Sequence, residues 1–110
     1  MAITVSTENP RLLLSEIKQR IDSRKIETWS YDTDGDFTHT PQQWKNHAWL
    51  RPTISEGNLV LNILKPRDAK LTWEVYGVYH GRFIEMLQIH LHDDFTSATA
   101  SANATGSDVV

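Results

Sequence analysis

The sequence predicts an α+β domain in which two amphipathic helices cover one face of an antiparallel sheet of about four strands. Three observations support this prediction. Apolar residues recur at three and four positions near both ends of the chain, short β-branched and aromatic segments lie between them, and a Gly-Asn turn joins two of these segments. The order of helix, strand, short helix, three strands and helix is typical of this fold class.

The first expected element is a helix at residues 10–24. Asn9 is suited to accept a hydrogen bond from a free N–H group of the first turn, and Pro10 lacks an N–H that would have no partner there. The apolar stripe of this helix consists of Leu13, Leu14, Ile17 and Ile21. Because amphipathic helices of small domains normally bury their stripe within the same chain, we interpret this stripe as core and not as a partner-binding face.

Residues 26–31 are rich in aromatic and β-branched side chains and are bounded by polar residues, which predicts the first strand. A short helix is expected at residues 41–46. Thr40 and Gln43 fit the cap and third helical positions of a capping box, and Pro41 fits the first helical position. This pattern predicts one or two turns of helix.

A hairpin is predicted from two apolar runs at residues 48–54 and 59–64. Residues 55–58 read Ser-Glu-Gly-Asn, and glycine and asparagine supply the positive φ angles of a tight turn. Pro52 has no N–H to donate to a neighbouring strand, so the first strand of the hairpin is expected at an edge or a bulge. An exposed edge would favour pairing with another chain.

Residues 71–95 form the most apolar and aromatic stretch of the chain. Alternation of apolar and polar side chains predicts the last strand at residues 71–77, and apolar spacing of three and four predicts the last helix at residues 81–94. One alternative stays open at residues 75–80. A helix that begins near Val75 would also have a continuous apolar stripe, and it would use its two glycines for close packing.

A chain of 110 residues can bury roughly two-thirds of its unfolded surface, which is enough for one hydrophobic core. We assign this core to a single domain at residues 1–95. Residues 96–110 are small and polar and contain no aromatic side chain, so they are predicted to form a disordered tail.

Composition narrows the class of protein. The net charge of −3 argues against the clustered positive charge that nucleic-acid binding requires, although a basic surface on the middle strands is a lesser alternative. The absence of cysteine removes disulfides and thiolate sites. The sequence shows no signal-peptide pattern and no apolar run of about 18 residues, the length that a membrane span needs. We therefore expect a cytoplasmic protein of bacterial type without membrane association.

The first candidate site is the acidic turn at residues 32–36. Asp32, Asp34 and Asp36 alternate with other residues, and His39 follows closely. Calcium and magnesium prefer several carboxylate oxygens, and alternate positions of a turn can converge on one point, so these four residues are the metal candidates. The alternative interpretation is a polar turn in which the aspartates accept hydrogen bonds from nearby backbone N–H groups.

The second candidate site is the predicted strand-to-helix junction at His80, Gly81 and Arg82. Free N–H groups at a helix start, together with an imidazole and a guanidinium, are the elements of an anion-binding pocket. In the alternative interpretation His80 ends the strand and Arg82 pairs with Glu85 one helical turn later. With His39, the residues His80 and Arg82 are the catalytic candidates.

A third group contains His90 and Asp94, which are four residues apart in the predicted helix, with His47 as a further source of a ligand. Two ligands from one helix do not complete a metal site. We therefore interpret these histidines as surface or core-rim residues.

No complete catalytic or cofactor-binding motif is present, so we expect a non-enzymatic domain that acts through self-association, as in a homodimer, or through a protein partner. The alternative is a small metal-dependent hydrolase or anionic-ligand-binding protein. It would use the acidic turn at residues 32–36 with His39, together with the junction from His80 to Arg82, and a divalent cation would be its cofactor.

Overall fold

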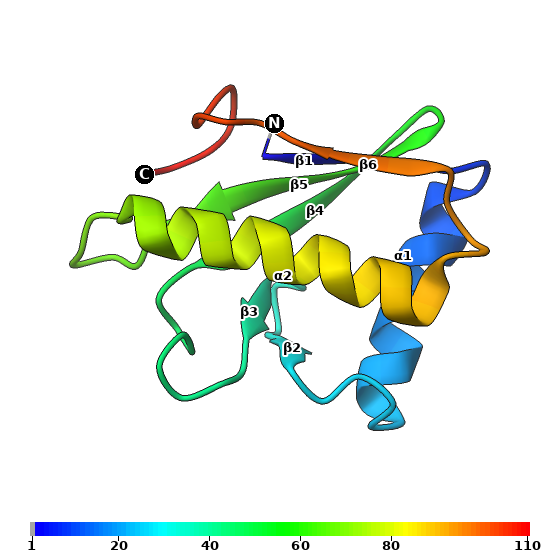
Figure 1. The fold of residues 1–110 in the computed structure, drawn as a ribbon, viewed down its shortest axis with the longest axis horizontal. Coiled ribbons are helices and arrows are strands. Elements are labelled where there is room, and N and C mark those ends of the chain that lie inside the picture. The colour runs from blue at the N-terminus through cyan, green and yellow to red at the C-terminus, as the bar shows by residue number, and fades with distance from the viewer. Residues whose placement is uncertain (1) are drawn as a thin grey trace.

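The computed structural model describes residues 2–110 and contains two helices and one six-stranded antiparallel sheet (Figure 1). The elements in chain order are β1 (Ile3–Ser6), α1 (Pro10–Asp22), β2 (Trp29–Tyr31), β3 (Phe37–His39), β4 (Trp49–Ser55), β5 (Asn58–Leu64), α2 (Trp73–Leu91) and β6 (Ser97–Ala100). The strand order in the sheet is β2-β3-β4-β5-β1-β6. The α+β class is confirmed, whereas the prediction of about four strands is wrong.

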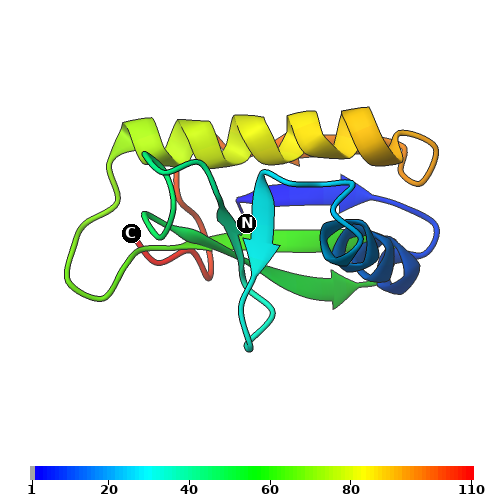
Figure 2. The same ribbon diagram turned by 90° about the horizontal axis from the view of Figure 1, so that it is seen from below.

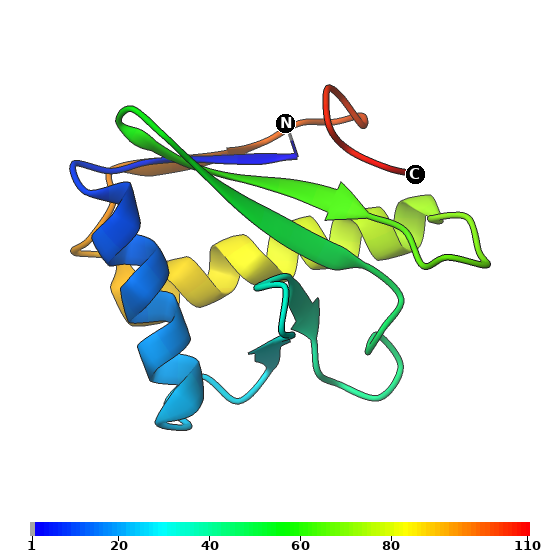
Figure 3. The same ribbon diagram turned by 180° about the vertical axis from the view of Figure 1, so that it is seen from behind.

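Both helices lie on the same side of β1, β4 and β5, below the sheet in Figure 1. Figure 2 shows α1 nearly end-on while α2 lies lengthwise, so the two helices run in different directions under the sheet. Figure 3 shows β2 and β3 turned down below β4. Phe37 and Leu50 are the paired residues that connect β3 to β4, and this short connection lets the sheet curve around its core.

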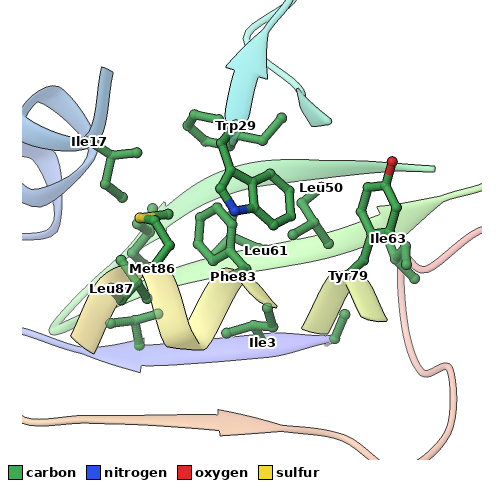
Figure 4. Close-up of a cluster of buried hydrophobic side chains, with 14 of the residues drawn as sticks. Ile3, Ile17, Trp29, Leu50, Leu61, Ile63, Tyr79, Phe83, Met86 and Leu87 are labelled. Atoms are coloured by element: carbon green, nitrogen blue, oxygen red, sulfur yellow. The ribbon is translucent and has the colours of Figure 1, made fainter. Parts of the chain in front are cut away.

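The core lies between the inner face of the sheet and the two helices. Trp29, Phe37 and Phe83 are 2%, 0% and 0% exposed and form its aromatic centre, in which the ring centroids of Phe83 and Trp29 are 5.0 Å apart (Figure 4). The surrounding side chains are mainly aliphatic, with Tyr76, Tyr79 and Met86 of α2 among them, and come from both helices and from β1, β4 and β5. Those labelled in Figure 4 include Ile3, Ile17, Leu50, Leu61, Ile63 and Leu87.

The first helix and the hairpin follow the sequence prediction closely. The Asn9 side chain accepts a hydrogen bond from Leu12 N at 3.1 Å, and α1 begins at Pro10. The hairpin is confirmed as β4 and β5, with Gly57 at φ 75° in its turn. Pro52 lies in an interior strand and not at an edge. The structure accommodates Pro52 because β3 pairs with β4 only at Leu50, which leaves the β3 side of β4 open there.

The predicted strand at residues 71–77 is wrong, and so is the helix start at residue 81. The helix α2 begins at Trp73, and the Thr72 side chain caps it by accepting a hydrogen bond from Val75 N at 3.2 Å. The alternative prediction, a helix that begins near Val75, is therefore confirmed for residues 75–80. Its apolar stripe is continuous, and this continuous stripe outweighs the alternation of a few residues at its start. A Cβ atom added at either of its two glycines, Gly77 or Gly81, would meet no neighbouring atom within 4 Å. These glycines therefore do not serve close packing within the chain.

The predicted helix at residues 41–46 is wrong, because this segment forms only a hydrogen-bonded turn. Trp44 N and Lys45 N both donate to Pro41 O, at 2.8 and 2.9 Å. The next amide, Asn46 N, donates to the Thr38 hydroxyl at 3.1 Å and not to a helical carbonyl. A tertiary hydrogen bond thus ends the helix after its first turn.

The predicted first strand at residues 26–31 is shorter than expected, and three strands were missed. The missed strands are β1, β3 and β6. In the pairing of β1 with β6, Val5 lies opposite Ala98 and Ile3 lies opposite Ala100. Small residues have low strand propensity, so only this tertiary pairing distinguishes β6 from a loop.

The prediction of a disordered tail is corrected for residues 97–100, which form β6, and for the last turn of the chain. Val109 N donates to Ile63 O at 2.9 Å, and Lys65 N donates to Val109 O at 2.8 Å. The pairing of β1 with β5 ends at Leu61, so backbone groups of β5 beyond that residue need another partner. The C-terminal segment provides this partner.

Candidate functional site

The acidic turn between β2 and β3 brings its three carboxylates together. Asp32, Asp34 and Asp36 each offer an oxygen, and these oxygens lie within 4.8 Å of one another. Asp32 Oδ1 accepts hydrogen bonds from Asp34 N at 3.0 Å and from Asp36 N at 2.9 Å. Gly35 has a φ of 83°, which this turn requires. The local hydrogen bonds are those of a polar turn, as the alternative interpretation predicted.

Asp36 also forms a bidentate ion pair with Arg51 of β4. Arg51 Nε donates to Asp36 Oδ1 at 3.0 Å, and Nη2 donates to Oδ2 at 2.8 Å. Asp36 is only 4% exposed, so its carboxylate is stabilised mainly by this guanidinium. The hydrogen bond and charge of Asp36 raise the pKa of Arg51 above its ordinary value. No local sequence signal predicts this pair, because its partners are 15 residues apart.

We expect Arg51→Gln to lower the free energy of unfolding by about 1–3 kcal/mol, because it leaves the buried Asp36 carboxylate without its cation. Urea unfolding at pH 7 measures this loss. Arg51→Gln combined with Asp36→Asn should lose less than Arg51→Gln alone, since no uncompensated charge is then buried. Arg11→Gln, at an exposed position of α1, is the matched control and should change stability by less than about 0.5 kcal/mol. Equal losses for Arg51→Gln and Arg11→Gln would contradict the assigned role of the ion pair.

The His39 side chain does not join the three aspartates of the acidic turn as a potential metal ligand. Among residues 2–110, the group of side chains that could share a metal ion contains the three aspartates and not His39. The His39 ring is 5% exposed and packs on Trp29, with a centroid distance of 4.6 Å. Its Nδ1 lies 2.7 Å from Thr28 O. The predicted four-residue metal set is therefore reduced to three residues, one of which is paired with Arg51.

His39 and Arg82, two of the three catalytic candidates, line the same surface depression. This depression of about 360 Å³ lies between α2, the end of β3 and the turn at residues 41–46. Its other polar lining residues are Thr28, Gln43 and, from α2, Glu85 and His90. Arg82 Nη1 donates to both carboxylate oxygens of Glu85 at 3.3 Å, which confirms the predicted pair within the helix. The pKa of His39 lies below its ordinary value, mainly because the ring is buried. The hydrogen bond with the Thr28 carbonyl and the charge of Glu85 oppose this lowering, and the charge of Arg82 adds to it.

His80 lies apart from this depression. Its ring stacks on Tyr76 with a centroid distance of 3.9 Å, and its Nδ1 lies 2.5 Å from Tyr76 O. Its Nε2 is buried and has no hydrogen-bond partner within the described chain. Burial lowers the pKa of His80, whereas the hydrogen bond to Tyr76 and the charge of Asp108 raise it.

The predicted anion pocket at His80, Gly81 and Arg82 is wrong, because these residues lie in the interior of α2. Backbone N–H groups there are used by the helix and are not free for an anion. His80 is 4% exposed, whereas the Arg82 side chain is 56% exposed. The two side chains therefore do not form one site.

The third group predicted from the sequence is not assembled. The helix α2 ends at Leu91, so Asp94 lies beyond it and does not share a helical face with His90. His47 is exposed in the turn before β4. Within the described part of the chain, the ligand atoms of His47, His90 and Asp94 do not lie close enough together to share a metal ion.

The two ends of the sheet differ in length and chemistry. At one end β2 has three residues, and at the other end β6 has four residues, Ser-Ala-Thr-Ala, without charge or proline. Figure 1 shows β6 in orange passing in front of the other strands. Ser101 N donates to Ala2 O at 2.9 Å. Because hydrogen bonding alternates along an antiparallel strand, the N–H and C=O groups of Ala98 and Ala100 point to the open edge.

No protein family, no characterised protein and no solved structure shows significant similarity to this chain. Among residues 2–110, neither helix combines the length and the hydropathy that crossing a membrane requires.

Proposed function

We propose that this protein is a non-enzymatic association module that forms a homodimer by antiparallel pairing of β6 with β6 of a second copy. The observation that carries the proposal is the open edge of β6, where Ala98 and Ala100 present backbone donors and acceptors. Natural proteins commonly protect such an edge with lysine, proline or a bulge. Residues 97–100 contain none of these protective residues.

The charges near β6 favour an antiparallel arrangement of the two copies. Asp93 and Asp94 precede β6, and the next acidic residue after it is Asp108. A two-fold axis through the middle of β6 places Asp93 and Asp94 of the two copies at opposite ends of the new strand pair. A parallel arrangement would bring these four carboxylates together, where they would repel one another.

The short length of β6 limits the strength of the proposed dimer. A stable interface usually buries at least about 1,000 Å² in total, and a pair of four-residue strands supplies only part of that area. We therefore expect weak, concentration-dependent association and not a permanent dimer.

Sedimentation velocity from low micromolar to millimolar concentration tests the proposal. The wild-type sedimentation coefficient should rise with concentration, and Ala98→Pro should abolish the rise. This substitution removes an N–H that points to the open edge, so the pairing of β6 with β1 keeps its hydrogen bonds. Ala102→Pro, at an exposed position beyond β6, is the matched control and should behave as wild type. A wild-type protein that stays monomeric throughout, or an Ala98→Pro variant that associates normally, would contradict the proposal.

A metal-dependent hydrolase is the competing proposal, and the convergence of three carboxylates in the acidic turn favours it. The ion pair of Asp36 with Arg51 disfavours it, because a cation there would lie close to a guanidinium. Thermal melting with calcium, magnesium, manganese or zinc distinguishes the two proposals. An ion present at 100 times its Kd should stabilise the fold by about 2.7 kcal/mol, and Asp34→Ala should remove this effect. The absence of a shift with all four ions would contradict the hydrolase proposal.

The cytoplasmic location, the bacterial character and the absence of a nucleic-acid partner stay predictions from composition. They are compatible with a small association module, and the dimerisation experiment does not depend on them.

A further inference from the structure

We propose that the depression lined by His39 and Arg82 binds a small organic carboxylate with an apolar body and a hydroxyl or N–H donor. The depression has a volume of about 360 Å³, which lies in the range of small-molecule sites. This site is separate from the β6 edge, and its occupancy does not depend on dimerisation.

The orientation of His39 determines which ligand group can bind it. Thr28 O is a carbonyl oxygen and can only accept a hydrogen bond, so His39 Nδ1 must carry the proton in the 2.7 Å contact. The neutral ring therefore has its lone pair on Nε2, the nitrogen that is not used by Thr28. The packing of Trp29 and Tyr79 against the ring holds this orientation. A ligand at His39 must consequently supply a hydrogen-bond donor.

Arg82 provides the positive charge of the depression. Glu85 accepts hydrogen bonds from Arg82 Nη1, while Arg82 Nε and Nη2 have no partner among the described residues. Two guanidinium nitrogens are therefore free to bind a carboxylate in bidentate fashion. Glu85 also contributes a negative charge beside this position. A monoanionic carboxylate therefore fits the lining better than a phosphate dianion, which Glu85 would repel more strongly.

The remaining lining favours a ligand with an apolar body. Pro41 and Trp44 of the turn at residues 41–46 contribute apolar surface to the depression, as do Met86 and Ile89 of α2. The Ile89 side chain is 64% exposed although it is a large aliphatic residue. An apolar ligand body would cover part of this side chain and remove it from water.

Chemical shift titration of the His39 ring nitrogens with 4-hydroxyphenylacetate tests the inference. This probe carries a carboxylate, an aromatic ring and a hydroxyl donor. We expect 4-hydroxyphenylacetate to cause saturable shifts of His39 Nε2. Phenylacetate should bind with about tenfold lower affinity because it lacks the hydroxyl donor. Inorganic phosphate should cause no saturable shift. Arg82→Gln should lower the affinity for 4-hydroxyphenylacetate by about tenfold or more, whereas Arg11→Gln should leave this affinity unchanged.

Four results would overturn the inference. Three of them are the absence of saturable His39 shifts with 4-hydroxyphenylacetate at tens of millimolar, equal affinity for phenylacetate, and equal affinity of the Arg82→Gln variant. Tighter binding of phosphate than of either organic acid would also overturn it, because it would identify the depression as an inorganic-anion site. Each measurement uses the complete chain. The comparison of the two organic acids needs no substitution and is independent of any effect of a variant on folding.

Discussion

Phe83→Ala should lower the free energy of unfolding by about 3–5 kcal/mol, the largest loss that we expect from a single substitution in this chain. Phe83 is completely buried and packs edge-on against Trp29, with ring centroids 5.0 Å apart (Figure 4). Its ring is tilted against that of Phe37, with centroids 5.6 Å apart. The substitution removes these contacts and leaves a cavity where α2 meets β2 and β3. Thermal unfolding should show a drop in Tm of roughly 12 °C or more.

Ile89→Ala is the matched control for this prediction because it truncates another large side chain of the same helix. Ile89 is 64% exposed, and alanine has the higher helix propensity, so stability should change by less than about 0.5 kcal/mol. A loss below about 1 kcal/mol for Phe83→Ala would show that the three aromatic rings do not form the centre of the core.

Local sequence signals predicted those elements whose structure depends on neighbouring residues. The cap at Asn9, the proline after it and the apolar stripe of α1 act within one helix, and the structure contains that helix. The turn at Gly57 depends on a positive φ angle that few residues adopt easily, and the hairpin follows from it. In both cases the physical cause lies within a few residues of the element.

Elements that depend on distant partners could not be predicted in this way. The strand β6 exists because β1 lies beside it, and its own residues have little strand propensity. In the segment at residues 71–77, the alternation of side chains resembled a strand, but the burial of one side of a 19-residue helix decided the structure. The segment at residues 41–46 does not continue as a helix, because the backbone N–H of Asn46 donates a hydrogen bond to the Thr38 hydroxyl.

The same distinction applies to the candidate site. Residue chemistry marked His39 and Arg82 as candidates for two different sites, and the structure places both in the lining of the depression beside α2. The sequence placed Arg82 with His80 because the two residues are close in the chain. A helix directs positions 80 and 82 to different sides, so His80 is buried while Arg82 is exposed. The pairing of Asp36 with Arg51 follows from the antiparallel register of β3 and β4, in which Phe37 lies opposite Leu50, and it had no local signal.

Stability should fall on acidification from pH 7.5 to pH 5, and the buried histidines should cause much of the loss. Burial lowers the pKa of both His39 and His80 below the ordinary value of 6.5. Above pH 6.5 both rings are neutral in the folded and unfolded states, so stability is fully present there. Below pH 6.5 the unfolded chain binds protons that the folded chain excludes, and the free energy of unfolding decreases until the folded pKa values are reached. The limiting slope is about 1.4 kcal/mol per pH unit for each histidine.

Urea unfolding at pH 7.5, 6 and 5 measures this loss, and His80→Phe isolates the contribution of one ring. The substitution removes a titrating group and the buried Nε2 that has no partner, while the carbonyl of Tyr76 retains its hydrogen bond within α2. We expect His80→Phe to reduce the acid loss by roughly half. Arg11→Gln, at an exposed position of α1, removes no group that titrates between pH 7.5 and 5, so its acid loss should equal that of wild type. Equal stability of the wild-type protein at pH 7.5 and pH 5 would mean that folding does not exclude protons from these two rings, contrary to their burial in the folded chain.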